Sequence, residues 1–232
     1  MEQAPTTLSE RLDALNQRID ESLKKALRNR SGLTLVPVSK RQPLHSLEAA
    51  YALGIRNFGE SLIQEAVLKV HALPDDITWH FIGHLQKNKV RKAVKAFTYI
   101  HSVDSLGLLH RIDDIATQER VCPKIFLQVN LALDPDKHGV HPDAVATMLG
   151  EALERKHLTC LGLMGIPPMQ ATPEETHEYF LGMAALRDEL KKQYPDWPGL
   201  LSLGMSNDFE IAIAAGSNFI RVGTALFGER LS

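Results

Sequence analysis

One stretch near the end of the chain shows the order of its structural elements most clearly. Residues 200–228 read LLSLGMSNDFEIAIAAGSNFIRVGTALFG. The stretch contains two short apolar runs, at 200–203 and 219–222. Each run precedes a segment in which apolar residues recur at helical spacing, at 209–215 and 224–227. Short apolar runs bounded by turn residues indicate buried strands, so this stretch predicts two strands that alternate with two helices.

The same alternation extends back from this stretch to residue 33. Six further apolar runs occur there, at 33–38, 56–59, 77–82, 98–102, 124–130 and 158–164. A helical segment follows each of them, at 44–53, 62–71, 86–95, 106–118, 142–153 and 174–193. Strict alternation of this kind gives parallel strands with right-handed crossovers, and eight such units can close into a ring. We therefore predict an α/β fold, a single (β/α)8 TIM-type barrel over residues 33–228.

An open doubly wound sheet is the alternative architecture for the same alternation. No Gly-x-Gly-x-x-Gly motif follows the first predicted strand, which makes a dinucleotide-binding sheet of that kind less favoured. No linker-like or low-complexity segment interrupts the pattern. We therefore expect residues 1–232 to form a single barrel domain.

An extra N-terminal helix is predicted before the barrel, within residues 1–30. Thr7 and Glu10 have the spacing of a capping box. Six apolar residues then recur at helical spacing: Leu8, Leu12, Leu15, Ile19, Leu23 and Leu27. Ser31 and Gly32 are expected to end the helix. Because its apolar stripe must lie against another surface, we place this helix on the outside of the barrel.

The composition argues against several classes of protein. The chain has 232 residues, with 26 Lys and Arg against 28 Asp and Glu, a formal net charge of −2. This balance does not favour general nucleic-acid binding. No apolar run approaches the ~20 residues of a membrane span, and the N-terminus has no signal-peptide pattern. Cys122 and Cys160 cannot form a disulfide framework, so we expect a cytoplasmic protein.

The histidines do not predict a metal site. His80 and His84 lie four residues apart but across a strand and a turn, which lacks the geometry of a helical zinc motif. His138 and His141 lie in a loop with nearby aspartates, where a polar loop is favoured over weak metal binding. No metal ligand is therefore assigned.

Lys40 is the first candidate functional residue, because it directly follows the first predicted strand. In (β/α)8 barrels the active site lies at the carboxyl ends of the strands. Desolvation at such a rim favours a neutral lysine amine, the form that makes a Schiff base with an aldehyde. A lysine that merely begins a solvated loop is the alternative.

The last two predicted strands end in residues that suit a phosphate group. Ser206 follows the seventh strand, and Gly223 and Thr224 follow the eighth. The N–H groups that open a short helix, together with a hydroxyl from the neighbouring loop, can hold an anion. An ordinary turn with a helix cap is the alternative.

Arg221 lies two residues before Gly223 and is permanently charged, so it needs a partner if it is buried in the barrel. An ion pair with a helix outside the barrel is the alternative. An amine at the first strand and an anion site across the ring, at the seventh and eighth strands, suit a phosphorylated aldehyde. Pyridoxal 5′-phosphate (PLP) is the obvious example.

Six stretches of the chain carry a resemblance to a known family. They are VPVSK (36–40), NFGE (57–60), WHFIGHLQKN (79–88), GLMGI (162–166), LSLGMSND (201–208) and AAGSNFIRVGTALFG (214–228). With them the chain resembles the pyridoxal phosphate homeostasis (YggS/PROSC) family, whose fold is similar to the N-terminal barrel domain of alanine racemase.

The resemblance implies a role for each candidate residue. Lys40 matches the lysine that forms the internal aldimine with PLP. Ser206, Gly223 and Thr224 match the positions that bind the phosphate. Arg221 matches the arginine that faces the pyridine nitrogen. The sequence departs from the family at Ser61, where asparagine is usual at a position near the cofactor.

By this resemblance the protein binds PLP and takes part in intracellular PLP homeostasis, by storage or delivery, without established catalytic turnover, so no catalytic residue is assigned. An arginine at the pyridine nitrogen leaves the ring neutral and a poorer electron sink. Alanine racemase takes a tyrosine base from a second domain, which we do not expect after Phe227. None of this chain's tyrosines is an obvious base: Tyr51, Tyr99, Tyr179 and Tyr194.

Two other functional hypotheses remain. The first is a PLP-dependent amino-acid racemase of fold type III, or a lysine-dependent aldolase, on the same barrel. The second is a regulatory interaction module that uses the basic helix at 86–95, although a solvated face is the simpler interpretation. The expected partners are PLP and either apo PLP-dependent enzymes or amino acids, with no nucleic acid and no membrane, and we expect a monomer.

Overall fold

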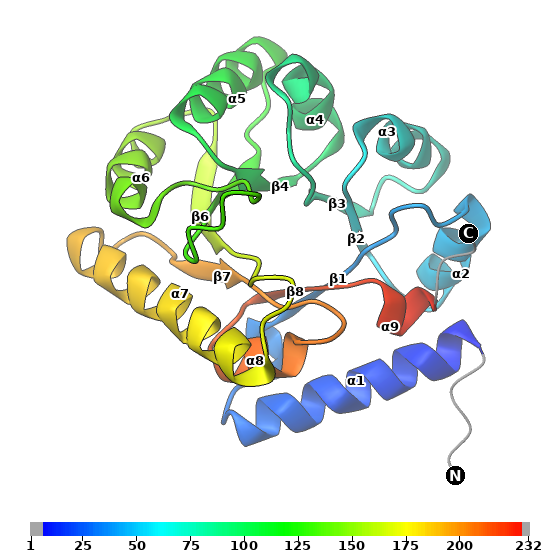
Figure 1. Cartoon of the computed structure of the whole chain (residues 1–232). Coiled ribbons are helices and arrows are strands. Elements are labelled where there is room, and N and C mark those ends of the chain that lie inside the picture. Colours follow the sequence, from blue (N-terminus) through cyan, green and yellow to red (C-terminus); the bar gives the residue numbers. More distant parts are fainter. Residues whose placement is uncertain (1–6, 229–232) are drawn as a thin grey trace.

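The computed structural model describes residues 7–228, in which eight parallel strands form a nearly closed barrel (Figure 1). The strands are β1 (Thr34–Pro37), β2 (Asn57–Glu60), β3 (Thr78–Phe81), β4 (Tyr99–Val103), β5 (Lys124–Gln128), β6 (Thr159–Met164), β7 (Leu200–Ser202) and β8 (Phe219–Val222). The helices are α1 (Leu8–Lys25), α2 (Leu44–Ala52), α3 (Ile63–Ala72), α4 (Val90–Ala96), α5 (Leu106–Glu119), α6 (Val145–Leu153), α7 (Pro173–Gln193), α8 (Phe209–Ala214) and α9 (Thr224–Phe227).

The order of the strands distinguishes a barrel from an open sheet. Hydrogen bonding runs in the order β1-β8-β7-β6-β5-β4-β3-β2. The first and last strands pair over four residues, from Thr34 opposite Phe219 to Pro37 opposite Val222. Beyond β1, a parallel bridge between Val38 and Gly59 joins it to β2. The predicted (β/α)8 barrel is therefore confirmed, and the open doubly wound alternative is wrong.

Alternate residues of each strand face the barrel interior and the surrounding helices, as expected for strands buried on both faces. Phe219 packs in the interior with Val36, Phe126 and Met164. Ile220, the next residue of β8, belongs to the larger core between strands and helices. This period of two directs Arg221, two residues after Phe219, into the barrel interior.

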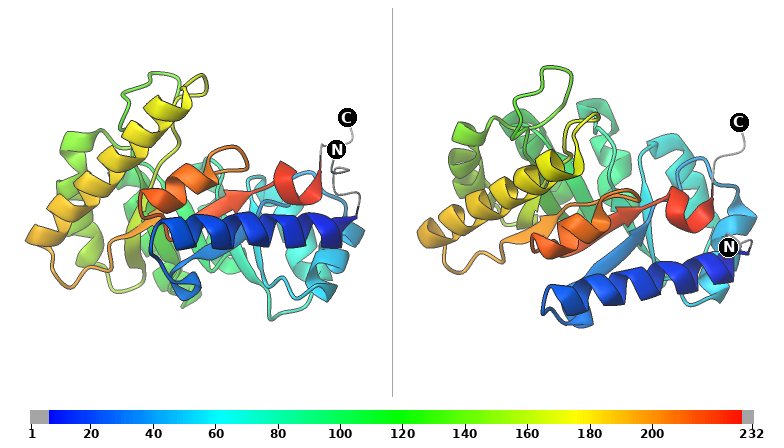
Figure 2. Two further views of the ribbon diagram at one scale, coloured as in Figure 1. Left: turned by 90° about the horizontal axis from the view of Figure 1, so that it is seen from below. Right: turned by 60° about the horizontal axis from the view of Figure 1, so that its bottom comes forward.

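The N-terminal helix packs on the outside of the barrel, as predicted. The capping box is present, with the Thr7 hydroxyl accepting from the Glu10 N–H and the Glu10 carboxylate accepting from the Thr7 N–H. Leu15, Ile19 and Leu23 are buried. The helix lies along α8 and α9 (Figure 2), so its apolar stripe covers the last two helices of the barrel.

The end of this helix differs from the prediction. α1 ends at Lys25 rather than near Ser31, and Leu27 is 95% exposed with a φ of +54°. The helix ends in a local left-handed turn at Leu27, in which the Arg28 N–H donates to the Leu23 carbonyl at 2.9 Å. The Arg28 guanidinium then donates to the carbonyl oxygens of Ile213 at 2.8 Å and Ser217 at 2.7 Å. Leu27 was therefore wrongly assigned to the stripe. No helix within residues 7–228 is long and apolar enough to span a membrane.

Candidate functional site

The predicted site residues lie at the carboxyl-terminal end of the barrel, but one expectation about their arrangement is wrong. Lys40 was expected to lie across the ring from Gly223. In a closed ring the first and last strands are neighbours, and the Val38 N–H donates to the Val222 carbonyl at 2.8 Å. Lys40 and Gly223 therefore follow adjacent strands, and a small ligand can reach both.

The loops after β7 and β8 meet at the start of α9. The Ser206 hydroxyl oxygen accepts from the Gly223 N–H at 3.2 Å and from the Ala225 N–H at 3.3 Å. Two backbone donors thus point at one oxygen atom, which is the arrangement that phosphate oxygens need. Thr224 begins α9 and is exposed. The sequence prediction missed Ala225, which contributes only its backbone.

Two glycines shape this region for different reasons. Gly204 has a φ of +91°, and a Cβ there would lie 2.6 Å from the Ala212 Cβ, so the loop before Ser206 requires glycine. A Cβ on Gly223 would meet only Val38, at ordinary contact distances of 3.5 and 3.6 Å. Packing within the protein therefore does not require a glycine at 223. An anion that approaches the N–H groups of Gly223 and Ala225 closely would require a glycine at this position.

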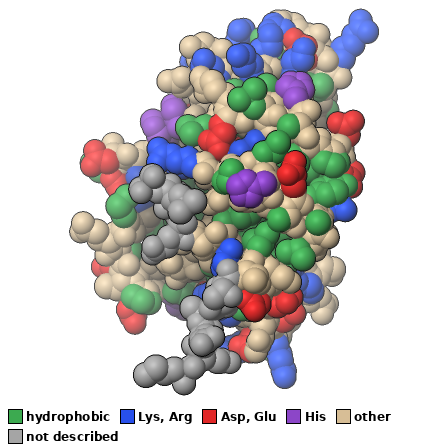
Figure 3. Space-filling model, turned by 90° about the vertical axis from the view of Figure 1, so that its right-hand side faces the viewer, with side chains coloured by type: hydrophobic (Ala, Val, Ile, Leu, Met, Phe, Trp, Pro, Cys, Tyr) green, Lys and Arg blue, Asp and Glu red, His purple; other side chains and the backbone are tan. Residues whose placement is uncertain are grey.

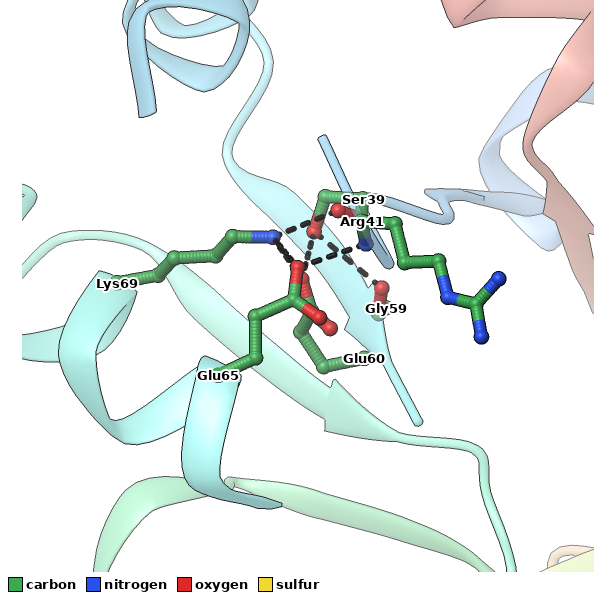
Figure 4. A network of polar contacts seen from close by, with 6 residues as sticks. All are labelled: Ser39, Arg41, Gly59, Glu60, Glu65 and Lys69. Carbon is green, nitrogen blue, oxygen red and sulfur yellow. Dashed lines mark hydrogen bonds and ion pairs between the residues drawn. The ribbon is translucent and has the colours of Figure 1, made fainter. Parts of the chain in front are cut away.

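A network of charged and polar residues, which we call the charged cluster, gathers where β1 and β2 end (Figure 4). The Lys69 ammonium donates to the Ser39 carbonyl at 2.7 Å, to Glu60 Oε1 at 2.7 Å and to Glu65 Oε1 at 2.6 Å. The Ser39 hydroxyl donates to Glu60 Oε1 at 2.6 Å. Burial raises the pKa of Glu60, while Lys69 and Ser39 oppose that shift by donating to its carboxylate. One ammonium thus joins two carboxylates to the end of β1.

The charged cluster fixes the backbone on both sides of Lys40. Ser39 is held through its carbonyl and its hydroxyl, and the Arg41 N–H donates to Glu65 Oε1 at 2.7 Å. Arg41 has a φ of +60°, in the left-handed region that costs a residue with a Cβ roughly 1–2 kcal/mol. Lys40 itself is half-buried, so the expected dry setting is met only in part.

Two buried polar atoms beside Lys40 have no hydrogen-bond partner within residues 7–228. They are Oε2 of Glu60 and Oγ of Ser61, at the end of β2. Buried polar atoms normally have a partner in the protein, a water or a ligand. Ser61 is also the position at which the sequence departs from its resemblance to the family. The Glu60 carboxylate bonds to Lys69 of α3, so it lies on the side of β2 that faces the helices.

Arg221 lies in the barrel interior and is 3% exposed. Its guanidinium donates to the Ser202 carbonyl at 2.6 Å, to the Ser202 hydroxyl at 2.8 Å and to the Gly165 carbonyl at 3.0 Å. The alternative of an outside ion pair with a helix is therefore wrong. A guanidinium has five N–H donors, so these contacts leave donors for a ligand. Burial lowers the pKa of Arg221 to about 10, which keeps it charged at neutral pH.

A chain of neutral groups continues from Arg221 through the interior. Ser202 Oγ lies 2.8 Å from His101 Nδ1, His101 Nε2 lies 3.0 Å from His80 Nδ1, and His80 Nε2 lies 3.0 Å from Asn57 Oδ1. Burial lowers the pKa of His80 to about 3 and that of His101 well below its usual value. Both imidazoles are therefore neutral at physiological pH.

The two neutral imidazoles allow only one direction of donation. The Asn57 oxygen can only accept, so His80 carries its proton on Nε2 and accepts at Nδ1. His101 must then donate from Nε2 and accept at Nδ1 from the Ser202 hydroxyl. That hydroxyl in turn accepts from Arg221. Every proton from Arg221 to Asn57 is thereby assigned, and we call this set the Arg221 relay.

The sequence reasoning missed both the charged cluster and the Arg221 relay. A signal for the relay was present, because His80 and His101 interrupt apolar strand runs at positions with the period of two. Lys69 lies in a mostly apolar helical segment, whose sequence gives no reason to expect a buried lysine. The carboxylates of Glu60 and Glu65, which pair with Lys69, explain its burial.

The basic segment at 86–95 forms a short 3-10 turn, Lys87–Lys89, and then α4. Lys and Arg side chains gather at the end of the molecule that α4 and α5 form (Figure 3). Arg91 and Lys95 both pair with Glu119 of α5, so part of this charge is neutralised within the fold. The interaction module stays a prediction.

Comparison with known proteins places the chain in a family. Residues 11–231 match the family described as alanine racemase, N-terminal domain. The chain is 43% identical to the pyridoxal phosphate homeostasis protein of Synechocystis over 199 residues, which covers 85% of this chain and 91% of that protein. It is 37% identical to the protein of that name from Aquifex aeolicus over 222 residues, covering 95% and 97%. The chain belongs to the pyridoxal phosphate homeostasis protein family. The resemblance seen in the sequence is confirmed.

Solved structures agree with this family assignment. PipY of Synechococcus elongatus with PLP bound has a TM-score of 0.85 at 39% identity, and without PLP it has 0.87 at 40% identity. Both cover 96% of this chain and 100% of PipY. An alanine racemase of Clostridium difficile has a TM-score of 0.74 at 14% identity, and the match covers 58% of its length. It shares the fold alone, so the racemase hypothesis rests on a distant relation.

Proposed function

We propose that this protein binds PLP through the amine of Lys40 and serves intracellular PLP homeostasis by storing the cofactor and delivering it to apo-enzymes. The observation that carries this proposal is the adjacency of β1 and β8, which puts Lys40 and the Ser206–Gly223 donors within reach of one small ligand. PipY, 39% identical over 96% of this chain, is known with PLP bound.

Each site residue has a physical role in this proposal. PLP supplies an aldehyde that combines reversibly with a lysine amine. The charged cluster holds the backbone on both sides of Lys40, so that the amine is positioned while its own side chain stays free of the ion pairs. Ser206, Gly223 and Thr224 bind the phosphate, and Ala225 adds a backbone N–H. Arg221, oriented by Ser202, donates to the pyridine nitrogen.

We propose further that the protein has no catalytic turnover. Arg221 keeps its proton at neutral pH, so a ring nitrogen that faces it gains none and the ring withdraws electrons weakly. Tyr179, whose hydroxyl donates to the Val129 carbonyl at 3.4 Å, stays protonated at neutral pH because burial raises its pKa to about 12, so it does not serve as a base. Incubation with single amino acids in deuterated water should give no robust α-proton exchange, and rapid exchange would favour an enzyme.

The proposed setting of this function is a monomeric, single-domain protein of the cytoplasm, with PLP and either apo PLP-dependent enzymes or amino acids as its partners. The near-neutral charge supports a role away from nucleic acids. Cys122 is exposed and Cys160 is buried, and both are free, which suits a reducing compartment.

Binding at Lys40 is tested by equilibrium dialysis of the full chain with PLP, followed by the visible absorption of the retained cofactor. Lys40→Ala should lose the lysine-bound absorption band. Lys156→Ala, which alters an exposed lysine before β6, should keep it. A Lys40→Ala protein with the wild-type band would refute the assignment.

Delivery is tested separately by mixing the PLP-loaded protein with an apo PLP-dependent enzyme and following the activity that the enzyme regains. The loaded protein should restore activity faster than its own loss of PLP to buffer permits. Restoration no faster than that loss would limit the role to storage.

A further inference from the structure

Three side chains that can bind a metal meet at the rim of the barrel, away from Lys40. His84 follows β3, Asp104 follows β4, and His138 lies in the loop after β5. The imidazole rings of His84 and His138 are stacked, with centroids 3.7 Å apart and planes 12° apart. Their Nδ1 atoms lie 3.2 Å and 3.9 Å from the same oxygen, Oδ2 of Asp104. One ligand atom from each residue lies within 4.8 Å of the other two.

These separations fit the coordination of a small divalent cation. Zinc bonds to imidazole nitrogen and carboxylate oxygen at about 2.0–2.2 Å, so neighbouring ligand atoms of a tetrahedral site lie roughly 3.4 Å apart. The two distances to Asp104 lie on either side of this value. Because an imidazole nitrogen binds a metal in the plane of its ring, the two nearly parallel rings must turn out of their stack before both nitrogens can face one cation.

The ligand set also has the right chemistry and exposure. Two imidazoles and one carboxylate suit zinc and related first-row divalent cations, with water in the remaining positions. The Asp104 side chain is 12% exposed, whereas those of His84 and His138 are 42% and 59% exposed. The negative charge thus lies at the base of the cluster, and the two imidazoles border the solvent from which a cation enters.

The backbone beneath His138 is well held. The Asn130 side chain donates to the carbonyls of Asp134 at 2.8 Å and Lys137 at 3.2 Å, and Gln128 donates to the His138 carbonyl at 2.9 Å. A Cβ on Gly139 would lie 2.5 Å from the Asn130 nitrogen, so the loop passes close to β5. These contacts hold the loop, so that the His138 side chain is in position before a metal ion binds.

We propose that His84, Asp104 and His138 form a binding site for a divalent cation of the zinc type. Along the chain, His84 lies near His80 and His138 lies near His141, and neither of these pairs predicts this site. The fold instead brings His84 and His138 together over Asp104. The cation site follows β3, β4 and β5, whereas the PLP site follows β1, β7 and β8, so the two are separate in the ring.

The test is calorimetric titration of the metal-free full chain with Zn²⁺. The wild-type protein should bind one equivalent. His138→Ala should weaken binding roughly 10- to 100-fold or more, because loss of even an outer partner of a ligand has that effect. His141→Ala is the matched control, since it alters an exposed histidine of the same loop, and should leave Zn²⁺ binding unchanged.

A spectroscopic measurement separates coordination from simple charge attraction. Co²⁺ in place of Zn²⁺ should give the absorption bands of a low-coordinate site in the wild-type protein and in Lys40→Ala. His84→Ala and His138→Ala should lose these bands while thermal unfolding stays within about 1 °C of the wild type. Absence of Zn²⁺ binding, or equal binding by His138→Ala and wild type, would overturn the site and leave only the electrostatic contacts of the two histidines with Asp104.

Discussion

Lys40 and Arg221 belong to neighbouring strands, and the barrel surrounds them in opposite ways. The residues beside Lys40 are held by a cluster of one ammonium and two carboxylates. Within residues 7–228 that cluster bonds to Ser39 and Arg41, and no contact is made to the Lys40 amine. Arg221 is bonded directly, but only by neutral groups.

Under the proposed function, the difference follows from what each cation would have to do. A lysine that forms and releases a bond to an aldehyde must exchange its proton, so ion pairs belong on its neighbours and not on its amine. An arginine that faces a ligand must keep its full charge. Neutral carbonyls, a hydroxyl and two imidazoles orient it without neutralising it. Substitutions around each of the two residues test this contrast.

The largest effect is expected from Lys69→Met. The change removes the ammonium and leaves the buried Glu60 carboxylate without its cation, so the free energy of unfolding should fall by about 3–5 kcal/mol. Denaturant unfolding at neutral pH measures the loss, with Lys192→Met on the exposed face of α7 as the control. A loss below about 1 kcal/mol would show that the charged cluster does not hold the end of β1.

The same variant should respond to pH in a defined direction. The pKa of Glu60 is raised in the folded protein, and removal of Lys69 raises it further. Glu60 therefore favours the folded state below its unfolded pKa of about 4.5, and this contribution is lost as pH rises through the folded value. The stability gap between Lys69→Met and wild type should narrow as pH falls toward 4.5. A gap that widens would contradict the assigned charges.

The Arg221 relay should show the opposite pH dependence. His80 and His101 have lowered pKa values in the folded state, so their contribution to stability is complete above the unfolded value of about 6.5. It is lost as pH falls toward about 3, the folded value of His80. His80→Gln should flatten the acid side of the stability profile, measured by denaturant unfolding. An unchanged profile would mean that the pKa of His80 is not lowered in the folded protein.

Ser202→Ala is expected to have an intermediate effect. It removes the hydroxyl that accepts from Arg221 and donates to His101, which leaves a buried imidazole nitrogen unsatisfied and costs about 1–3 kcal/mol. PLP affinity should fall as Arg221 loses its orientation. Ser202→Thr keeps the hydroxyl and should recover most of both properties. If Ser202→Thr were no better than Ser202→Ala, the hydroxyl would not be the connecting group.

Gly223→Ala is expected to have the smallest effect on folding. The added Cβ at position 223 would contact only Val38, at 3.5–3.6 Å. The free energy of unfolding should therefore change by no more than about 0.5 kcal/mol. Retention of PLP should nevertheless weaken, since the methyl group hinders approach to the Gly223 N–H. Ser206→Ala should weaken retention by about 1–3 kcal/mol per lost charge-assisted bond. Unaltered affinity in both variants would place the phosphate elsewhere.

The sequence predicted the barrel well because periodicity is a local property. Runs such as 219–222 coincide with strands, and the rule that barrel sites follow the strands located Lys40, Ser206, Gly223 and Thr224 at one end. The end of α1 was missed, because its left-handed turn falls on Leu27 and not on the glycine that usually marks such a turn.

The polar networks could not be predicted for a related reason. The pairings of Lys69 with Glu60 and of His80 with His101 join different elements, and the register and closure of the barrel decide which side chains meet. The error about Lys40 and Gly223 came from treating the first and last strands as distant. Ring closure makes them neighbours.

The central claim is that Lys40 is the residue that holds PLP. Incubation of the full chain with PLP, reduction with borohydride and mass spectrometry of the peptides test it directly. We predict a pyridoxyl group on Lys40 in the wild-type protein and its loss in Lys40→Ala. An adduct on another lysine, or no adduct while PLP remains bound, would contradict the account.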